Sequence, residues 1–405
     1  MPDESCEEGR RHARWLEENS APKGGWKLDS VVLMSPGIGR AFRGYERFST
    51  ELYAVMHESV ETLLMRGAGS PKAGEVTVGG LSRDGWMARF LGRLRWDRFA
   101  WEALSFGIKA WARLGTRRLQ VIHYSEPILN NLFSRLERVW PRSVRRVFSH
   151  GLNMDPEHTL RCHHLHQVSL VAYERALELG VPETRMSLIP HGVRSEALIP
   201  RSNEERRELR ARYALPSEIP LVLCVAAVNS RHKRIPVLLE ACAGVREDFL
   251  LLLCGPAEEP EWIARGHALL GERFRHLYVP PGEMANVYAM ADQFVLPSLI
   301  EGFGLAVVEA ALAGLPVLVH DSRHFRWLLG PHWDGFVDMR KPENLREALQ
   351  WSLERLPDLR RRMASLREEW VSRYDWLALA PKYLEMFARA AEAPGVTIAM
   401  ELGYS

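Results

Sequence analysis

The 405-residue sequence has few cysteines, and none of them are paired at the C-x-x-C spacing of a metal knuckle. The five thiols are odd in number and far apart, which argues against a disulfide framework and against a zinc site of that type. We expect them to be reduced. They are Cys6, Cys162, Cys224, Cys242 and Cys254.

Long hydrophobic runs and a net charge of one sign are also missing. No stretch of eighteen or more uncharged apolar residues occurs, and the first 20 residues are rich in Glu and Arg where a secretory signal is apolar. We therefore expect a cytoplasmic protein. The 53 basic and 51 acidic residues leave a formal charge of +2, so net charge alone recruits neither nucleic acid nor a membrane.

What the sequence does have is a regular alternation of short apolar runs with turn residues and helical periods. This alternation predicts an α/β fold with parallel sheets, and the length suits two or three domains. The predicted strands are 31–34, 119–123, 144–149 and 186–189 in the first half, and 221–227, 249–254, 276–279, 293–296 and 316–319 in the second.

The two sets of strands predict two Rossmann-like, doubly wound domains. We expect residues 1–25 to be a mobile tail, 26–197 to form the first domain and 198–370 the second, with 371–392 packing back on the first. Ligands of such folds bind beyond the carboxyl ends of the strands. The two domains should therefore face one another across a cleft.

Residues 291–310 are the most informative segment. A buried strand leads into a loop with Glu301, then Gly302 and Gly304, then a helix that contains Glu309. The glycines let backbone amides approach a ligand, and the free N–H groups of a helix start suit a diphosphate. An ordinary helix start is the simpler alternative. A glycosidase carboxylate pair is disfavoured, because eight residues mostly along a helix separate two groups by about 10 Å, against about 5 Å for a retaining pair.

The same segment, with its Pro-Ser-x-x-Glu-Gly-Phe-Gly-x5-Glu-Ala frame, resembles glycosyltransferase family 4, which are retaining enzymes of the GT-B fold. The resemblance extends through 189–193, 225–241 and 251–255, and it spans residues 30–385 in all. It implies a nucleotide-sugar donor and no resident cofactor. The absence of any Asp-x-Asp triplet fits this expectation, since nothing resembles the metal-holding motif of the other main glycosyltransferase fold. The base and sugar of the donor and the acceptor remain open.

Residue by residue, the resemblance implies a role for each part of the second domain. Glu301 contacts the transferred sugar, Glu309 holds the ribose, and Lys233 neutralises the departing diphosphate. Family members usually have an arginine at the position that corresponds to Ala227, where it helps Lys233 to bind the phosphates. Because this chain has alanine there, Arg231 or Arg234 would have to take that role. The remaining donor-binding candidates are Gly255, Gly302, Phe303, Gly304 and Leu305.

In the first domain, Gly44 resembles the family's glycine that faces the donor phosphates, although a tight turn alone would also explain this glycine-rich loop. His150, after a predicted strand, is expected to orient the sugar's primary hydroxyl, against the alternative of a capped surface residue. The nearby residues His158, Cys162, His163, His164 and His166 are possible metal ligands. His158 and Cys162 would share one helical face, as would Cys162 and His166, but there is no clear fourth ligand, so we expect no metal.

Residues 85–118 combine eight basic residues with four tryptophans. Such a stretch suits a peripheral contact with a membrane surface, and a core helix with snorkelling arginines is the alternative.

The expected function is that of a retaining glycosyltransferase acting on a carbohydrate or lipid-linked acceptor. Two alternatives remain. One is a nucleotide-sugar-binding subunit without turnover, and the other is a GT-B sugar phosphorylase or nucleotide-sugar epimerase.

Overall fold

The computed structural model describes residues 28–40, 44–81, 98–114, 121–151, 156–330 and 332–403. The predicted tail 1–25 lies outside these ranges. The chain divides into two compact units. Unit 1 comprises the chain up to Gly192 together with the part from Trp376 onward, and unit 2 is Val193–Asp375.

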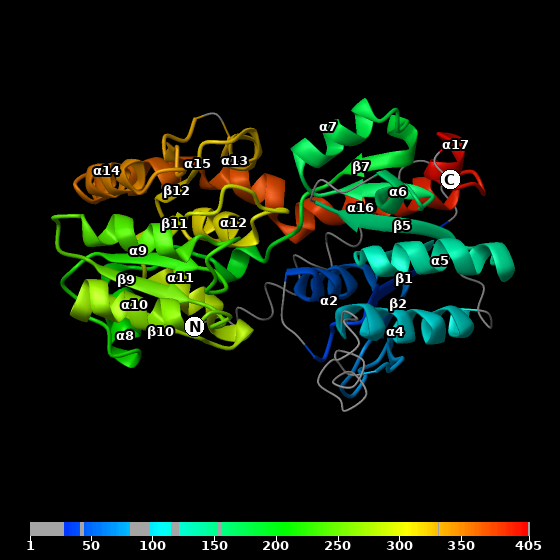
Figure 1. Ribbon diagram of the computed structural model, residues 1–405, viewed down its shortest axis with the longest axis horizontal. Coiled ribbons are helices and arrows are strands. Elements are labelled where there is room, and N and C mark those ends of the chain that lie inside the picture. The colour runs from blue at the N-terminus through cyan, green and yellow to red at the C-terminus, as the bar shows by residue number, and fades with distance from the viewer. Residues whose placement is uncertain are drawn as a thin grey trace, which may run out of the picture. The chain divides into compact units, whose positions relative to one another are not determined.

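Unit 1 contains a seven-stranded parallel sheet in the order β3-β2-β1-β4-β5-β6-β7, with helices packed against it (Figure 1). Its strands are β1 (Ser30–Ser35), β2 (Glu61–Arg66), β3 (Glu75–Thr77), β4 (Val121–Tyr124), β5 (Arg145–His150), β6 (His164–Gln167) and β7 (Met186–Leu188). Its helices are α2 (Gly44–Met56), α4 (Arg98–Leu114), α5 (Pro127–Val139), α6 (Pro156–Thr159), α7 (Leu170–Glu178), α16 (Trp376–Ala391) and α17 (Ile398–Glu401), with a 3-10 turn at Glu183–Arg185.

Unit 2 contains a six-stranded parallel sheet in the order β10-β9-β8-β11-β12-β13. Its strands are β8 (Leu221–Val225), β9 (Leu250–Cys254), β10 (Phe274–Leu277), β11 (Gln293–Leu296), β12 (Val317–His320) and β13 (Phe336–Val337). Its helices are α8 (Asn203–Arg212), α9 (Ile235–Ala243), α10 (Glu261–Leu270), α11 (Met284–Met290), α12 (Leu305–Leu312), α13 (Arg323–Leu329), α14 (Pro342–Leu353) and α15 (Leu356–Tyr374), with 3-10 turns at Ser195–Ala197, Gly271–Arg273 and Pro281–Glu283.

Each sheet has a switch point where the strand order reverses. In unit 1 the chain moves outward from β1 through β2 to β3 and then returns to place β4 on the other side of β1. In unit 2 it moves from β8 to β10 and returns to place β11 beside β8. Connections leave the two strands of a switch point in opposite directions, which opens a crevice beyond their carboxyl ends.

The expected α/β class with parallel sheets is confirmed, and most predicted strands lie within a residue or two of the observed ones. The prediction for 276–279 was displaced, because the strand is Phe274–Leu277. The helical interpretation of the histidine-rich segment was wrong. His164 and His166 belong to strand β6, where both are buried, and no metal-holding group of histidine, cysteine and carboxylate side chains occurs among the described residues.

The segment from Trp376 onward completes the core of unit 1. On α16, Trp376, Leu379 and Tyr383 pack with Val31 and Phe48. The chain approaches so closely here that a Cβ on Gly192 would lie 2.2 Å from the Trp376 ring. A glycine is therefore required where the chain leaves unit 1 for unit 2.

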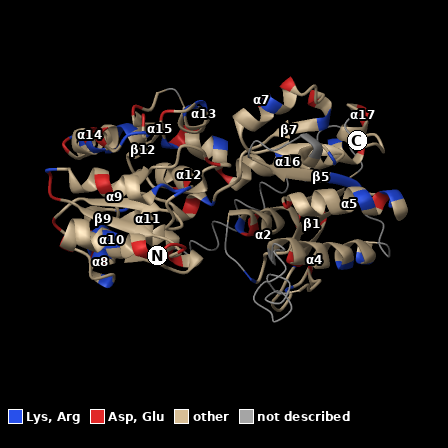
Figure 2. Ribbon diagram, viewed as in Figure 1, with Lys and Arg blue, Asp and Glu red and all other residues tan. Residues whose placement is uncertain are grey.

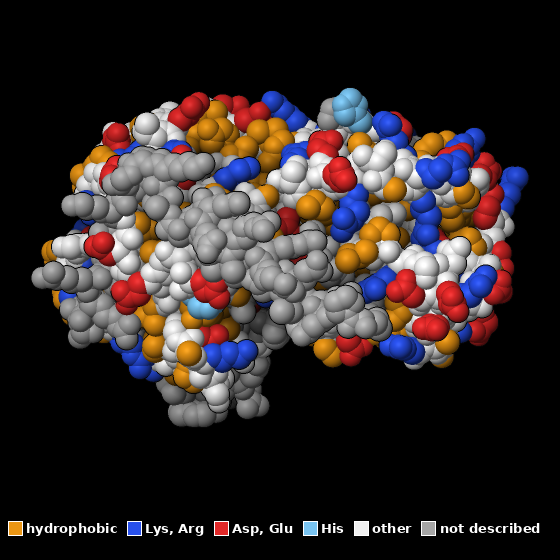
Figure 3. Space-filling view, turned by 180° about the vertical axis from the view of Figure 1, so that it is seen from behind, with side chains coloured by type: hydrophobic (Ala, Val, Ile, Leu, Met, Phe, Trp, Pro, Cys, Tyr) orange, Lys and Arg blue, Asp and Glu red, His pale blue; other side chains and the backbone are white. Residues whose placement is uncertain are grey.

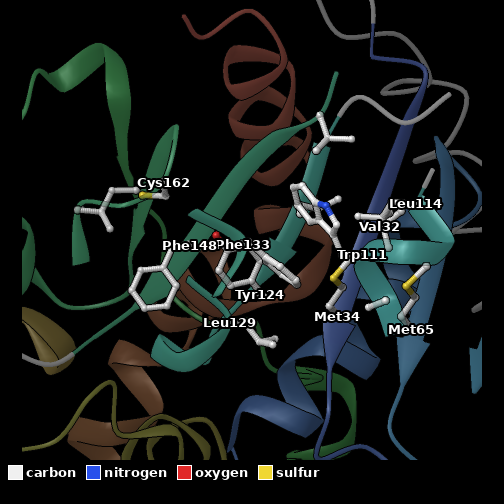
Figure 4. Close-up of a cluster of buried hydrophobic side chains, with 14 of the residues drawn as sticks. Val32, Met34, Met65, Trp111, Leu114, Tyr124, Leu129, Phe133, Phe148 and Cys162 are labelled. Atoms are coloured by element: carbon white, nitrogen blue, oxygen red, sulfur yellow. The ribbon is translucent and has the colours of Figure 1, made fainter. Parts of the chain in front are cut away.

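The predicted membrane-facing stretch 85–118 is described only over α4. Trp111 is fully buried and stacks on Phe133 at a centroid distance of 5.2 Å, and Figure 4 shows it beside Met34. Trp101 is partly buried, whereas Trp86 and Trp96 lie outside the described residues. The outward side of α4 carries Lys109 and Arg113, so contact with a membrane surface stays a prediction.

Charged residues of both signs are spread over the helices of each unit (Figure 2). Basic and acidic side chains are also interspersed on the surface seen from behind (Figure 3). Within the described ranges, no helix has both the length and the apolar character that crossing a bilayer requires.

We predict that Trp111→Ala lowers the free energy of unfolding by about 3 to 5 kcal/mol, because it empties a fully buried site. Ile108→Ala, on the exposed side of the same helix, should change it by no more than about 0.5 kcal/mol. Urea unfolding followed by circular dichroism measures both. Equal losses in the two variants would contradict the assignment of Trp111 to the core.

Candidate functional site

The switch point of unit 2 brings together the loops that follow β8 and β11. The β8 loop ends in a tight turn, in which the Asn229 side-chain oxygen accepts hydrogen bonds from the backbone N–H groups of His232 at 3.1 Å and Lys233 at 2.8 Å. This turn precedes α9 and fixes the backbone that carries the Lys233 ammonium group.

Lys233 and Glu301 form an ion pair across the switch point. The Lys233 Nζ donates to Glu301 Oε1 at 2.6 Å, and the two side chains are 19% and 9% exposed. The residues are far apart in sequence, so their pairing depends on the sheet order that places β8 next to β11. A cation and a carboxylate that are partly accessible at a crevice can exchange partners when a charged ligand arrives.

The loop after Glu301 is shaped by Gly304 and by His324. Gly304 directly precedes α12 and has a φ of +94°. Residues other than glycine rarely adopt this backbone conformation. His324 Nε2 lies 2.9 Å from the carbonyl oxygen of Phe303. Burial lowers the pKa of His324, so the neutral ring donates its N–H to that carbonyl. The backbone around Phe303 is thereby held next to the free N–H groups of α12.

Glu309 lies about one turn inside α12 and is 5% exposed. Its Oε2 accepts a hydrogen bond of 2.7 Å from the hydroxyl of Tyr288, which is fully buried on α11. The Tyr288 hydroxyl therefore orients the Glu309 carboxylate. Sequence reasoning did not identify Asn229, His324 or Tyr288, because each acts through a contact that sequence spacing does not reveal.

Gly255 follows β9 at the same edge of the sheet. A Cβ at this position would lie 2.0 Å from the carbonyl oxygen of Ala226, so only glycine permits the two loops to approach. Gly302 and Leu305 flank the Phe303–Gly304 turn, and with Gly255 they line the same edge.

The structure does not place every predicted donor-binding residue next to Lys233 and Glu301. Arg231 is exposed, and the guanidinium group of Arg234 donates to the carbonyl oxygens of Met339 at 2.5 Å and Pro297 at 3.3 Å. Arg234 thus anchors the loops after β11 and β13. Neither arginine takes up the position next to Glu301 that Lys233 occupies.

In unit 1, the switch point gathers a second polar group. Gly44 begins α2, and His150 is the last residue of β5, where it is 5% exposed and stacks on Phe148. The β1 strand ends at Ser35, and Ser125 and Glu126 follow β4 directly. The hydroxyl of Ser125 is buried without a hydrogen-bond partner among the described residues.

Glu126 has an unusual environment. The side chain as a whole is partly exposed, but its Oε2 atom is buried and has no hydrogen-bond partner in the described part of the chain. Burial and the nearby carboxylate of Glu46 raise the pKa of Glu126 to about 8. A protonated carboxyl group can both donate and accept hydrogen bonds. No sequence signal had singled out Glu126.

Residues 205–370 match the family model described as glycosyl transferases group 1. A phosphatidyl-myo-inositol mannosyltransferase of Mycobacterium leprae is 32% identical over 178 residues, which are 42% of this chain and 46% of the relative. A D-inositol 3-phosphate glycosyltransferase of Xylanimonas cellulosilytica is 30% identical over 225 residues, 53% of each chain. The chain thus spans about half the length of the curated relatives it matches.

Solved structures match over both units. A sucrose-phosphate synthase from Thermosynechococcus elongatus has a TM-score of 0.72 at 18% identity, covering 89% of this chain and 98% of that one. The Anabaena protein HepE, in complex with UDP and glucose, has a TM-score of 0.71 at 14% identity, covering 89% and 99%. At these identities the likeness shows the fold, and the two parallel-sheet units are those of GT-B. At the level of sequence, the match to the group 1 family of glycosyl transferases lies within residues 205–370 of unit 2.

Proposed function

We propose that the protein transfers a sugar from a nucleotide-sugar donor to an acceptor hydroxyl. The observation that carries this proposal is the Lys233–Glu301 pair beside the glycine-shaped start of α12, at the switch point of unit 2. A cation, a carboxylate and free backbone N–H groups at one edge suit a sugar diphosphate. The relatives are named as glycosyltransferases, and one fold neighbour is solved with UDP and glucose.

In the proposed reaction the bond between the anomeric carbon and the donor phosphate oxygen breaks, and a bond to the acceptor oxygen forms. Negative charge develops on the departing diphosphate, where Lys233 and the amides around Phe303, Gly304 and Leu305 stabilise it. Glu301 holds the transferred sugar, and Glu309 accepts hydrogen bonds from the ribose. The acceptor's proton passes to the leaving phosphate oxygen, on the same face of the sugar, which gives retention of configuration.

The donor must first change the existing ion pair. Lys233 donates to Glu301, so each charge already has a partner. A bound diphosphate attracts the ammonium group and leaves Glu301 to accept hydrogen bonds from sugar hydroxyls. The pair therefore keeps both groups at the crevice until a donor separates them.

The acceptor is proposed to be a carbohydrate or lipid-linked molecule that presents hydroxyl groups to unit 1. The support is the polar group beyond β1, β4 and β5, which includes Glu126, Ser125 and His150. Such groups form hydrogen bonds with hydroxyls of a neutral ring. We propose a cytoplasmic enzyme, with residues 85–118 as the candidate for peripheral membrane contact.

Two other functions would use the same fold. A binding subunit would hold a nucleotide sugar without turnover, and a phosphorylase would use inorganic phosphate in place of a nucleotide. An assay of nucleoside diphosphate release from a panel of nucleotide sugars separates them. Release that depends on an added acceptor supports transfer, whereas binding without release, or sugar phosphate formation without nucleotide, contradicts it.

We predict that Lys233→Ala and Glu301→Gln each lower kcat/KM more than tenfold, at least about 1.4 kcal/mol of transition-state stabilisation, because each removes a charge next to the reacting centre. The double variant should lose much less than the product of the two single effects, because the side chains act as a pair. Steady-state kinetics of nucleotide release measure all three.

Lys72→Ala and Glu240→Gln serve as matched controls, since both residues are exposed and lie away from this switch point. They should retain full activity. Unchanged kinetics in Lys233→Ala and Glu301→Gln would overturn the site assignment.

We further predict that activity is unchanged in excess EDTA. Lys233 and the start of α12 would supply the positive charge that a divalent cation supplies in metal-dependent transferases. Initial rates with EDTA, and with EDTA followed by added Mg²⁺ or Mn²⁺, check this. A strict requirement for the added cation would show that these groups do not suffice at the diphosphate.

The raised pKa of Glu126 predicts how stability depends on pH. Its ordinary pKa is 4.5, and the folded protein keeps the proton up to about 8, so between these values the unfolded chain binds fewer protons than the folded one. The free energy of unfolding should therefore fall as the pH rises through this window, by at most about 1.4 kcal/mol per unit, and then level off.

Glu126→Gln removes this titration and should flatten the decline, whereas the exposed control Glu61→Gln should leave it in place. Urea unfolding at several values of pH tests both variants. Parallel curves for the wild type and Glu126→Gln would mean that Glu126 titrates normally.

A further inference from the structure

A basic cavity lies at the edge of the unit 2 sheet opposite the candidate donor site. It has a volume of about 260 Å³ and is lined by Arg206, Arg207 and Arg210 of α8, by Asp292, and by the chain that leads into β8. Asp292 immediately precedes β11, and Pro220 immediately precedes β8. Because the strands are parallel, this amino edge is remote from the loops that carry Lys233 and Glu301.

Asp292 is shared among three guanidinium groups. Arg206 and Arg210 both donate to its carboxylate, and Arg360 of α15 lies 3.3 Å from it. The backbone N–H of Leu221 also donates to Asp292 at 2.7 Å. Although burial alone would raise the pKa of Asp292, the three arginines hold it below its ordinary value. A single carboxylate therefore provides the negative charge next to three guanidinium groups.

The positive charge is not fully compensated. Burial and the repulsion of Arg206 and Arg210 outweigh the attraction of Asp292 and lower the pKa of Arg360 to about 10. Arg207 lines the cavity as a fourth cation, and Glu218 is the second carboxylate, whose Oε1 accepts a hydrogen bond from Ser217. Among the lining residues, three arginines face two carboxylates, an excess of one positive charge, and Arg360 adds a further cation that contacts Asp292 from α15.

Arg206 also has an unused donor. Its side chain is 10% exposed, and its buried Nε atom has no hydrogen-bond partner among the described residues. Its terminal nitrogens, by contrast, donate to Asp292, to Asn203 and to the carbonyl oxygen of Ala291. A buried N–H group without a partner is costly, so a charged side chain that lines a cavity favours an acceptor oxygen that can reach this group.

We propose that this cavity binds a small oxyanion, a phosphate ion or the phosphate group of a monoester. Guanidinium groups match the oxygens of such anions through paired, charge-assisted hydrogen bonds. Water occupies about 30 Å³ per molecule in the liquid, so the cavity has room for one phosphate and several waters. The anion would bridge Arg206 and Arg207 and offset the excess charge between α8, α15 and the starts of β8 and β11.

The site is independent of the proposed transferase activity, and its test requires no turnover. The thermal unfolding of Lys233→Ala is followed while sodium phosphate replaces sodium chloride at constant ionic strength, so that the candidate donor site does not contribute its lysine. We expect the melting temperature to rise with phosphate and to follow the saturation curve of a single site. Glycerol phosphate in a second series distinguishes a monoester from the free ion as the preferred ligand.

Two substitutions assign the effect to this cavity. In the Lys233→Ala background, Arg207→Gln removes a cavity cation that has no hydrogen bond or ion pair to other described residues, and it should weaken phosphate binding at least tenfold without altering the fold. Arg206→Lys keeps the charge but lacks the buried Nε donor, and it should also weaken binding. The control Arg212→Gln, an exposed arginine on the same helix outside the cavity lining, should bind phosphate as before.

The proposal is overturned if phosphate and chloride give the same melting temperature, or if the phosphate effect persists in both Arg207→Gln and Arg206→Lys. An effect that Arg212→Gln reduces as much as Arg207→Gln would show general charge attraction to α8 instead of a site.

Discussion

The adjacency of β8 and β11 is the constraint on which the candidate site depends. The two strands pair through Val222 with Gln293 and Leu223 with Phe294, although their sequences are far apart. The loop after β8 leads to α9 and the loop after β11 leads to α12, on connections that depart to opposite sides of the switch point. Without this strand pairing, nothing would bring Lys233 close to Glu301.

The rigid parts of the candidate site are backbone segments that several contacts within unit 2 hold in place. Gly304 is confined to positive φ, Gly255 is confined by the Ala226 carbonyl, and His324 holds the Phe303 carbonyl from α13. These restraints position backbone N–H groups before any ligand is present. Preorganised donors of this kind stabilise developing charge without further rearrangement. The side chains of Lys233 and Glu301, by comparison, are partly accessible and can exchange partners.

Local patterns in the sequence revealed the elements whose residues are buried on both faces. The apolar runs at 31–34, 221–224 and 250–254 are wholly buried parts of central strands, and such runs are recognisable from the sequence. Strand β6 was misjudged because its buried face carries His164 and His166, which hydrogen-bond to Ser187 and to the Ile189 carbonyl. Histidine in a strand interior leaves no apolar period to recognise.

The sequence predicted those parts of the candidate site whose residues are close to one another along the chain. The Glu301-to-Glu309 frame lies on one strand, loop and helix, and the resemblance to a family added Lys233. Tyr288 and Glu126 could not be found this way, since the first acts through a contact between helices and the second through burial beside Glu46. Arg234 shows the converse case, in which a local pattern suggested a role that its observed contacts do not carry. Its position next to Lys233 suggested a phosphate ligand, but its left-handed backbone, with φ +50°, precedes α9, and its side chain donates to carbonyl oxygens of neighbouring loops.

The two edges of the unit 2 sheet hold cations in different ways, and this difference bears on catalysis. At the amino edge, several arginines share one carboxylate, so positive charge is in excess. At the carboxyl edge, Lys233 is paired with Glu301. A ground-state diphosphate gains little from a lysine that it must first separate from a carboxylate. The charge that develops as the sugar departs gains more. Under the proposed function, donor binding separates the pair before the reaction, so this cost is common to the bound donor and the transition state, and the faster chemical step comes from the extra charge that Lys233 stabilises as the sugar departs.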